Sequence, residues 1–310
     1  MLLFLLLLCG CTQNGQENSE SRFLLNTVAQ ITADCSDQTL NGAFALCEEL
    51  EKTLSRTVEN SDVSRLNAAE GFVPVSAHTL RVVDRALYYA ELSGGRFDIT
   101  ICPVSMLWDF QNKVVPNRDE IAAALQNVDY HSISVREDAI ALNGKKIDLG
   151  GIAKGYVADR VIDYFKENNV EKALVNLGGS ISVIGEYTVG IKTPFENTVL
   201  LAVPLCDGCA VTSGIDQRYI KQDGAFYHHI LDPATGVGVE NELASVTVLG
   251  SSLCAMDCDA LSTVCMLLGT EEGLSLINST RETEAVFISR EGEVTLSAGL
   301  YRENDQIRFK

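Results

Sequence analysis

The chain has 310 residues, of which 46% are hydrophobic and 21% are charged, a composition that is ordinary for a folded protein. Its formal net charge of −18 argues against binding to nucleic acid. It also argues against binding to an anionic membrane surface through a basic patch. An anionic ligand would therefore need local help from backbone N–H groups, a few Lys or Arg side chains, or a metal ion.

The first eight residues form an apolar run that is too short to span a bilayer and is typical of a secretory signal. Cys11 follows Gly10, as in a bacterial lipobox, where a small residue precedes the cysteine that becomes lipidated. We expect a signal peptide with its lipobox at residues 1–11, a flexible tether at 12–21 and the folded body at 22–310. The protein would then be lipid-anchored on the extracytoplasmic face of a bacterial cell membrane. The alternative is a frayed hydrophobic N-terminus.

Hydrophobic periodicity predicts a mixture of helices and strands along the body. The expected helices lie at 38–54, 76–92 (capped by Ser76), 117–126 (capped by Asn117), 153–165, 253–268 and 271–277. The expected strands lie at 22–33, 133–135, 139–142, 146–149, 173–176, 180–184, 188–192, 198–204, 209–212, 218–221, 226–230, 243–249, 285–289 and 293–296, with loops at 55–67 and 97–110. Because strands and helices do not alternate strictly and no linker divides the body, the sequence predicts one compact α+β domain.

Residues 146–159 join a predicted strand end to a helix through a tight glycine turn. Gly150 and Gly151 permit positive φ angles and the close approach of a ligand. The helix N-terminus behind them offers free N–H groups and a partial positive charge, which suits a phosphate, and Lys154 adds a full charge. The alternative is an ordinary strand-to-helix connection, because the stretch is neither a GxGxxG nor a Walker motif.

Asp259 and Thr263 lie four residues apart on the predicted helix 253–268, so their oxygen atoms share one face. Their neighbours are apolar, and a buried carboxylate usually has a charged partner or a metal ion. A hard ion such as Mg²⁺ accepts carboxylate, hydroxyl and carbonyl oxygens while keeping positions for phosphate and water. The alternative is an acidic residue near the helix start that the helix dipole favours.

His228 and His229 end a predicted strand and precede the turn at residues 232–236. A histidine in this place can act as a general base near neutral pH. In the alternative, the turn bonds its own backbone and the histidines are merely exposed. Trp108 stands with Phe110 in an apolar loop, where it either stacks on a planar ring or fills the core.

The sequence holds ten cysteines, two of them in the export segment. Cys206-x-x-Cys209 and Cys254-x-x-x-Cys258 together offer four zinc ligands. No histidine accompanies them, and their spacing is not that of a tight zinc motif. Buried free thiols, or a disulfide near Cys206 and Cys209, are therefore the favoured interpretation.

Seven stretches occur in the order and at the spacing of one known family. From the N-terminus they are 64–67 (SRLN), 95–100 (GRFDIT) with Pro103 and 107–108 (LW), 148–156 (DLGGIAKGY), 174–179 (LVNLGG), 212–214 (TSG), 229–233 (HILDP) with 235–236 (TG), and 259–263 (DALST). Over residues 23–276 the chain thus resembles the ApbE family, the FAD:protein FMN transferases. The resemblance implies T-fold-type elements with a mixed, largely antiparallel sheet and flanking helices. It also implies an exported lipoprotein, in agreement with Cys11.

The resemblance implies a role for each matching residue. Asp259, Thr263 and the carbonyl of Gly151 would hold Mg²⁺ at the pyrophosphate of FAD, and His229 would deprotonate the acceptor hydroxyl. Other matching residues would contact FAD or line its flavin and adenine pockets: Asp148, Lys154, Trp108, Asp109, Phe110, Leu25, Thr57 and Ile230. The sequence departs from the family pattern at Ser180, where Asp is common, at Asp109, where Gly is common, and at Thr57, where an aromatic residue is common.

The implied reaction is the Mg²⁺-dependent transfer of FMN from FAD to a Thr or Ser hydroxyl of an acceptor protein, such as a membrane redox-complex subunit, with release of AMP. One alternative is a Mg²⁺-dependent FAD pyrophosphatase. It would bind the same ligand but use no acceptor protein, and it would yield FMN and AMP. A third hypothesis is a non-catalytic flavin-binding lipoprotein. The expected partners are FAD, the acceptor and the membrane through the lipid anchor, but not nucleic acid.

Overall fold

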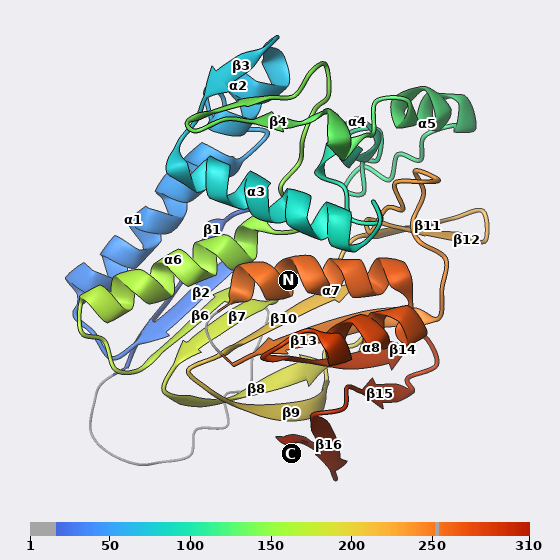
Figure 1. The fold of residues 1–310 in the computed structure, drawn as a ribbon. Helices are drawn as coiled ribbons and strands as arrows, with labels where there is room; N and C mark the ends of the chain where they lie inside the picture. The colour runs from blue at the N-terminus through green and yellow to red at the C-terminus, as the bar shows by residue number, and fades with distance from the viewer. Residues whose placement is uncertain (1–16, 252–253) are drawn as a thin grey trace.

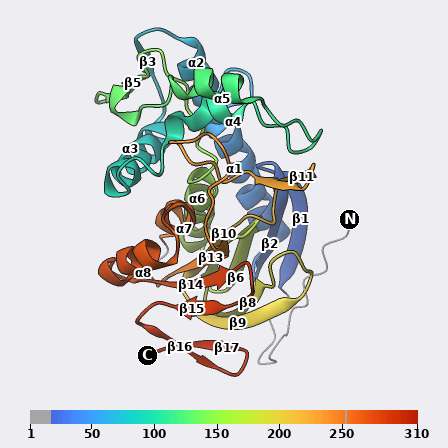
Figure 2. The same cartoon turned by 90° about the vertical axis from the view of Figure 1, so that its right-hand side faces the viewer.

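The computed structural model describes residues 17–251 and 254–310, and its elements form stacked layers (Figures 1 and 2). The central layer is an eight-stranded sheet in which every neighbouring pair is antiparallel. Its spatial order is β1 (Asn18–Leu24), β2 (Thr27–Ala33), β6 (Ala173–Leu177), β7 (Ser180–Ile184), β10 (Cys209–Gly214), β13 (Leu243–Gly250), β14 (Thr283–Ser289) and β15 (Val294–Leu296).

Helices cover one face of the central sheet and a second sheet covers part of the other (Figure 2). The helices are α1 (Asp37–Leu54), α6 (Ala153–Glu167), α7 (Ala255–Leu268) and α8 (Thr270–Ser279). The second sheet has the order β16 (Leu300–Glu303), β17 (Gln306–Phe309), β9 (Val199–Cys206) and β8 (Glu186–Lys192). All eight residues of β13 are buried, because apolar clusters pack against both faces of the central sheet.

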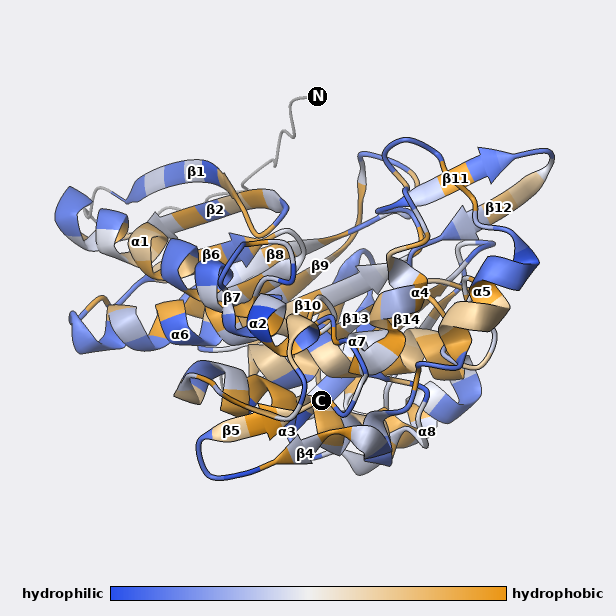
Figure 3. Cartoon of the chain, turned by 90° about the horizontal axis from the view of Figure 1, so that it is seen from above, coloured by the Kyte–Doolittle hydropathy of each residue, from blue (hydrophilic) through white to orange (hydrophobic). Residues whose placement is uncertain are grey.

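A smaller group of elements lies beyond the helices (Figure 1). It contains α2 (Asp62–Ala68), β3 (Phe72–Pro74), α3 (Ala77–Leu92), the 3₁₀ turns η1 (Ile99–Ile101) and η2 (Tyr130–Ser132), α4 (Cys102–Ser105), α5 (Arg118–Leu125), β4 (Ser134–Val135) and β5 (Ala139–Ala141). The hairpin of β11 (Tyr219–Gln222) and β12 (Ala225–His228) projects from one side of the body (Figure 3). A separate apolar cluster around Trp108 joins α4 and α5 to the segment that follows this hairpin.

The structure confirms the predicted α+β class with a largely antiparallel sheet and flanking helices. The predicted caps are also confirmed, because the side chain of Ser76 accepts a hydrogen bond from the Thr79 amide and Asn117 forms a capping box with Glu120. No helix within the described residues combines the length and apolarity that a membrane crossing requires. The predicted signal peptide and the lipidation site Cys11 lie outside the described residues.

The single strand predicted at 22–33 is wrong, because the structure has a hairpin there. Leu25 and Asn26 both have positive φ angles, of 54° and 55°, and form a two-residue turn between β1 and β2. The Leu25 amide donates a 3.0 Å hydrogen bond to the Glu51 carboxylate on α1. A leucine rarely adopts this conformation, whereas Asn26 does so more readily, so the sequence carried only a weak turn signal at this position. β1 also begins at Asn18, inside the range expected for the tether.

The strand predicted at 146–149 is also wrong. The side-chain amide of Asn67 bonds both the N–H of Ile147, at 2.7 Å, and its carbonyl, at 2.9 Å. The next amide, of Asp148, donates to the carbonyl of Ile99 at 2.8 Å. This backbone is therefore satisfied by a side chain and a loop instead of by a neighbouring strand.

Three further expectations differ from the structure. The loop predicted at 55–67 contains most of α2, which is too short to show a clear apolar period. The loop predicted at 97–110 contains η1 and the one-turn helix α4. The expected strands stop at residue 296, whereas β16 and β17 follow β15 and belong to the second sheet, in which β17 pairs with β9.

Candidate functional site

The site is organised around Asp259, which is 3% exposed and lies in the first half of α7. Its Oδ2 accepts a 2.9 Å hydrogen bond from the backbone N–H of Gly155 on α6. Its Oδ1 lies 3.5 Å from Nζ of Lys154. The carboxylate is thus buried with one cationic partner and one backbone donor, which offsets much of the cost of removing it from water.

Gly155 makes this meeting of α6 and α7 possible. A Cβ atom at this position would lie 2.1 Å from the carbonyl oxygen of Ala255, which is backbone and cannot swing away. Only glycine therefore allows the two helices to approach so closely.

Thr263 and Gly151 lie near Asp259, and these three residues form what we call the Asp259 corner. Thr263 lies one helical turn after Asp259, and its Oγ1 is 3.2 Å from Oγ of Ser213 on β10. A Cβ atom built on Gly151 would lie 3.7 Å from the same Oγ1, so the glycine turn before α6 faces Thr263 directly. Thr263 thus lies close to Gly151 and one turn from Asp259 on the same helix.

The donor set of this corner fits a hard divalent cation. A buried carboxylate, a threonine hydroxyl and a turn carbonyl supply oxygen only, which is what Mg²⁺ prefers over nitrogen or sulfur. Three protein ligands leave positions for water and for phosphate oxygens. The residues present therefore fit Mg²⁺, with Asp259, Thr263 and Gly151 as its candidate ligands.

Asp148 lies at the other end of the glycine turn. Its Oδ1 accepts a 2.9 Å hydrogen bond from the Gly150 amide, and its Oδ2 forms a 2.8 Å ion pair with Nε of Arg56. Ser105 Oγ lies 3.4 Å from the same Oδ2. Asp148 therefore fixes the shape of the turn and places the cation of Arg56 beside it.

His229 is half-buried directly after β12, while its neighbour His228 is buried. Nδ1 of His229 lies 3.3 Å from the carbonyl oxygen of Arg218, which can only accept a hydrogen bond. The proton of the neutral ring therefore sits on Nδ1, and Nε2 is left with a lone pair. Burial, followed by the positive charge of Arg218, lowers the pKa of His229 to about 3, so the ring is neutral at physiological pH.

Comparison with known proteins decides the family. The sequence model described as "ApbE family" matches residues 25–287. The chain belongs to the ApbE family. It is 34% identical over 265 residues to a FAD:protein FMN transferase of Klebsiella pneumoniae, which covers 82% of this chain and 83% of that protein. It is 30% identical over 327 residues to a FAD:protein FMN transferase of Treponema pallidum, covering 94% of this chain and 90% of that protein.

Solved structures of ApbE proteins share this fold. The ApbE protein of Thermotoga maritima superimposes with a TM-score of 0.83 at 29% identity, and the match covers 91% of this chain and 97% of that one. The flavin transferase ApbE of Vibrio cholerae gives a TM-score of 0.81 at 26% identity, with coverage of 91% and 97%. The match therefore spans most of the chain.

The aromatic residues predicted to contact FAD form a group beside His229. Trp108 and Phe110 stack with ring centroids 5.8 Å apart, and Phe110 meets the His229 ring edge to face at 6.4 Å. Trp108 is 6% exposed and donates from Nε1 to the carbonyl of Gly236 at 3.2 Å, so it belongs to the core of its cluster. Phe110 is the more accessible of the two rings and the better placed to meet a planar ligand.

Asp109 replaces the glycine that is common in the ApbE family. Its carboxylate forms hydrogen bonds within the local turn. It accepts hydrogen bonds from the amides of Gln111 and Asn112 and from the side chain of Asn112, which lower its pKa. The structure gives this side chain a turn-forming role in place of an obvious ligand contact.

The three residues predicted to line the flavin or adenine pocket lie in different settings. Ile230 is 6% exposed and belongs to the main core, next to His229. Thr57 is exposed and adjoins Arg56, the partner of Asp148. Leu25 is half-buried in the β1–β2 turn. Thr27, at the end of that turn, approaches the glycine pair after β6, since a Cβ atom on Gly178 would lie 2.1 Å from its Oγ1.

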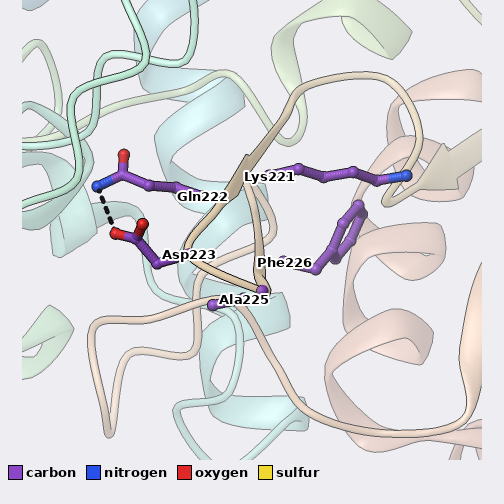
Figure 4. A pocket seen from close by; sticks show the side chains of 6 residues that line it. Lys221, Gln222, Asp223, Ala225 and Phe226 are labelled. Carbon is purple, nitrogen blue, oxygen red and sulfur yellow. Dashed lines mark hydrogen bonds between the residues drawn. The ribbon is translucent and has the colours of Figure 1, made fainter.

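Two hollows in the described structure lie apart from the Asp259 corner. One, of about 300 Å³, is lined only by residues 221–226 of the β11–β12 hairpin, where Gln222 bonds Asp223 and Lys221 runs along Phe226 (Figure 4). The other, of about 950 Å³, includes Trp108 but no other residue proposed for FAD.

Sequence reasoning gave no role to Arg56, Arg218 or Ser213, although all three touch proposed site residues. Ser213 stands in one of the seven family stretches, which was a usable signal. Arg56 is 92 residues from Asp148, and no local pattern could have revealed that pairing. Of the proposed zinc ligands, Cys206 is exposed, whereas Cys209, Cys254 and Cys258 come together.

Proposed function

We propose that this protein transfers FMN from FAD to a Ser or Thr hydroxyl of an acceptor protein, releases AMP, and uses Mg²⁺ at Asp259, Thr263 and Gly151. The observation that carries the proposal is the meeting of a buried carboxylate, a hydroxyl and a glycine turn beside Lys154. Membership of the ApbE family, whose relatives are named FAD:protein FMN transferases, supplies the substrate.

The glycine turn and Lys154 would bind the pyrophosphate of FAD. Residues 150–152 lead into α6, and the partial positive charge of a helix N-terminus favours a phosphate. Lys154 supplies a cation within a chain of net charge −18, while Arg56 supplies a second one near Asp148. A bound Mg²⁺ would neutralise charge that develops on the pyrophosphate oxygens as the anhydride bond breaks.

His229 would accept the proton of the acceptor hydroxyl at Nε2. The hydroxyl oxygen then forms a bond to the phosphorus of the FMN half, and the anhydride bond to AMP breaks. The neutral ring is required for this step, and both burial and the Arg218 charge keep it neutral. Phe110, packed edge to face on His229, would help to orient the base and would offer a face to the flavin.

A FAD pyrophosphatase would use the same corner but would direct water to the phosphorus. The exposed Thr57, in place of the aromatic residue common in the family, is the feature that favours this second candidate. A non-catalytic flavin-binding lipoprotein would not require the buried Asp259 or a histidine held in its neutral form.

The lipobox at Cys11 supports a further part of the proposal, namely that the mature protein is anchored by lipid on the extracytoplasmic face of a bacterial membrane. Its acceptor would then be a protein exposed on the same face, such as a subunit of a membrane redox complex.

Release of AMP from FAD, measured with and without an acceptor protein, tests the proposal. A transferase releases AMP only when Mg²⁺ is present, and much faster when the acceptor is added. AMP and free FMN appearing at one rate regardless of the acceptor would identify the pyrophosphatase. Tight FAD binding without AMP would identify the flavin-binding protein.

A further inference from the structure

Three cysteines from separate parts of the fold converge at the start of α7. Cys209 opens β10, Cys254 directly precedes α7, and Cys258 lies in its first turn. The Sγ atom of Cys258 is 3.5 Å from that of Cys209 and 3.9 Å from that of Cys254, and all three lie within 4.8 Å of one another. Cys209 and Cys258 are buried, and Cys254 is half-buried.

A glycine allows the three sulfurs to come this close. A Cβ atom built on Gly250, the last residue of β13, would lie 2.8 Å from the sulfurs of Cys209 and Cys254 and 2.9 Å from that of Cys258. Any other residue at this position would therefore collide with all three sulfurs, so the cluster requires a glycine here.

The separations match ligands of a thiophilic ion. Zinc–sulfur bonds of about 2.3 Å in tetrahedral geometry place neighbouring sulfurs about 3.8 Å apart. The separations of Cys258 from Cys209 and Cys254, 3.5 and 3.9 Å, lie on either side of this value. A disulfide would instead need one pair to close to about 2.05 Å, which leaves the third sulfur without a role.

The N-terminus of α7 and a buried carboxyl group lie beside the three thiols. Cys254 and Cys258 lie at the N-terminus of α7, where the partial positive charge of the helix favours a thiolate. The carboxyl group of Asp159 accepts hydrogen bonds from the amides of Ala255 and Met256, at 2.9 and 3.0 Å, and so caps the same helix end. Solvent reaches half-buried Cys254, so water can take a fourth ligand position.

We propose that Cys209, Cys254 and Cys258 bind a Zn²⁺ ion, as a structural site distinct from the Mg²⁺ corner. The sulfur donors suit a soft ion, whereas the Asp259 corner offers only oxygen to a hard one. The ion would tie α7 to β10 immediately before Asp259, because Cys258 is its neighbour in the chain. Its occupancy would thereby fix the start of the helix that carries Asp259.

The experiment titrates the reduced, chelator-treated protein with Zn²⁺ against a competing chromophoric chelator, in the absence of FAD. We expect one Zn²⁺ per chain, not displaced by excess Mg²⁺. Cys209→Ala and Cys258→Ala should weaken binding by more than about 100-fold, which exceeds the loss of an outer partner of a metal site. Two matched controls, exposed Cys206→Ala and buried Cys265→Ala on α7, should leave the affinity unchanged.

X-ray absorption at the zinc edge tests the unsubstituted protein, so the result does not depend on how the variants fold. We expect three sulfur neighbours at about 2.3 Å. A coordination shell in which the zinc ion has only nitrogen and oxygen neighbours would overturn the proposal. So would a failure of the reduced protein to retain zinc, or an equal loss of affinity in Cys206→Ala.

Discussion

The backbone N–H of Gly155 donates a 2.9 Å hydrogen bond to Oδ2 of Asp259, and this bond joins the start of α6 to α7. The other carboxylate oxygen lies 3.5 Å from Nζ of Lys154. One oxygen of Asp259 thus holds two helices together, while the other is oriented toward the cationic side of the site. Structural and chemical roles of this side chain can therefore be separated by substitution.

Asp259→Asn should abolish catalysis while preserving the fold. The amide oxygen can still accept the Gly155 hydrogen bond, but the negative charge that would bind Mg²⁺ is lost. We expect AMP release to fall by about 100-fold or more, the scale of losing one electrostatic group at a reacting centre. The measurement is the rate of AMP formation from FAD, with thermal unfolding as the check on folding.

Asp259→Ala is the matched comparison for stability. It leaves the buried N–H of Gly155 without a partner, which costs about 1–3 kcal/mol in the free energy of unfolding. We expect the alanine variant to fold, to be less stable than the asparagine variant, and to be equally inactive. Turnover retained by either variant would remove the metal assignment from Asp259.

Gly155→Ala should disturb the site without changing any polar group. Its Cβ would lie 2.1 Å from the Ala255 carbonyl oxygen, so α7 must shift, at a cost of about 1–3 kcal/mol or more. Gly42→Ala is the control, because there the Cβ would meet the terminal hydroxyl of Tyr164, which can rotate away. Urea unfolding and AMP release of the two variants should differ, and equal effects would contradict this view of the helix contact.

The sequence predicted the parts of this site that follow local rules. Asp259 and Thr263 share a helix face because they are four residues apart. Gly150 and Gly151 do lie in a turn, although neither adopts the positive φ angle that glycine permits. The contact of Asn67 with Ile147 spans 80 positions, and it replaces the strand that the apolar alternation predicted. Such a substitution of a side chain for a strand partner depends on tertiary structure and leaves no local pattern.

His229→Gln should separate transfer from binding. Removal of a general base lowers the rate by about 10²–10⁴-fold, so we expect flavin transfer to fall within this range while FAD affinity is kept. His131→Gln, at an exposed position away from these contacts, serves as the control. If His229→Gln left the transfer rate unchanged, another group would have to accept the proton.

The pH dependence of transfer follows from the same residue. The neutral ring is the active form, and its pKa is lowered from 6.5 to about 3. The transfer rate should therefore stay level as the pH falls through 6.5. Protonation of the histidine should lower the rate only at far more acidic pH. An acidic limb centred near pH 6.5 would contradict the lowered pKa.

His228 should make the stability of the fold depend on pH. Burial lowers its pKa to about 4, and its Nε2 lies 3.0 Å from the Val239 carbonyl. Between pH 6.5 and 4 the unfolded chain binds a proton that the folded chain does not, so stability falls as the pH falls through this window. Between pH 7 and 5.5 the loss is about 1 kcal/mol from this residue. Urea unfolding at both pH values measures this loss of stability, and the His228→Gln variant should lack it.

The β1–β2 turn shows a different limit of sequence reasoning. Glu51 on α1 bonds the amide of Leu25 and helps to hold a turn that begins with a leucine at a φ of 54°. Local propensity opposes this conformation, so the hairpin could not have been predicted from residues 22–33 alone. The predicted pocket residue Leu25 consequently lies at a turn and not within a strand.

The mass of an acceptor peptide after incubation with the protein, FAD and Mg²⁺ shows whether the protein transfers FMN to a hydroxyl group. A matched peptide with Ser and Thr replaced by Ala is the control. The account predicts an FMN-sized mass gain on the Ser/Thr peptide alone, one AMP per modified peptide, and loss of both with a chelator or with Asp259→Asn. Cleavage of FAD to free FMN with the peptide mass unchanged, or modification that persists with the chelator, would contradict it.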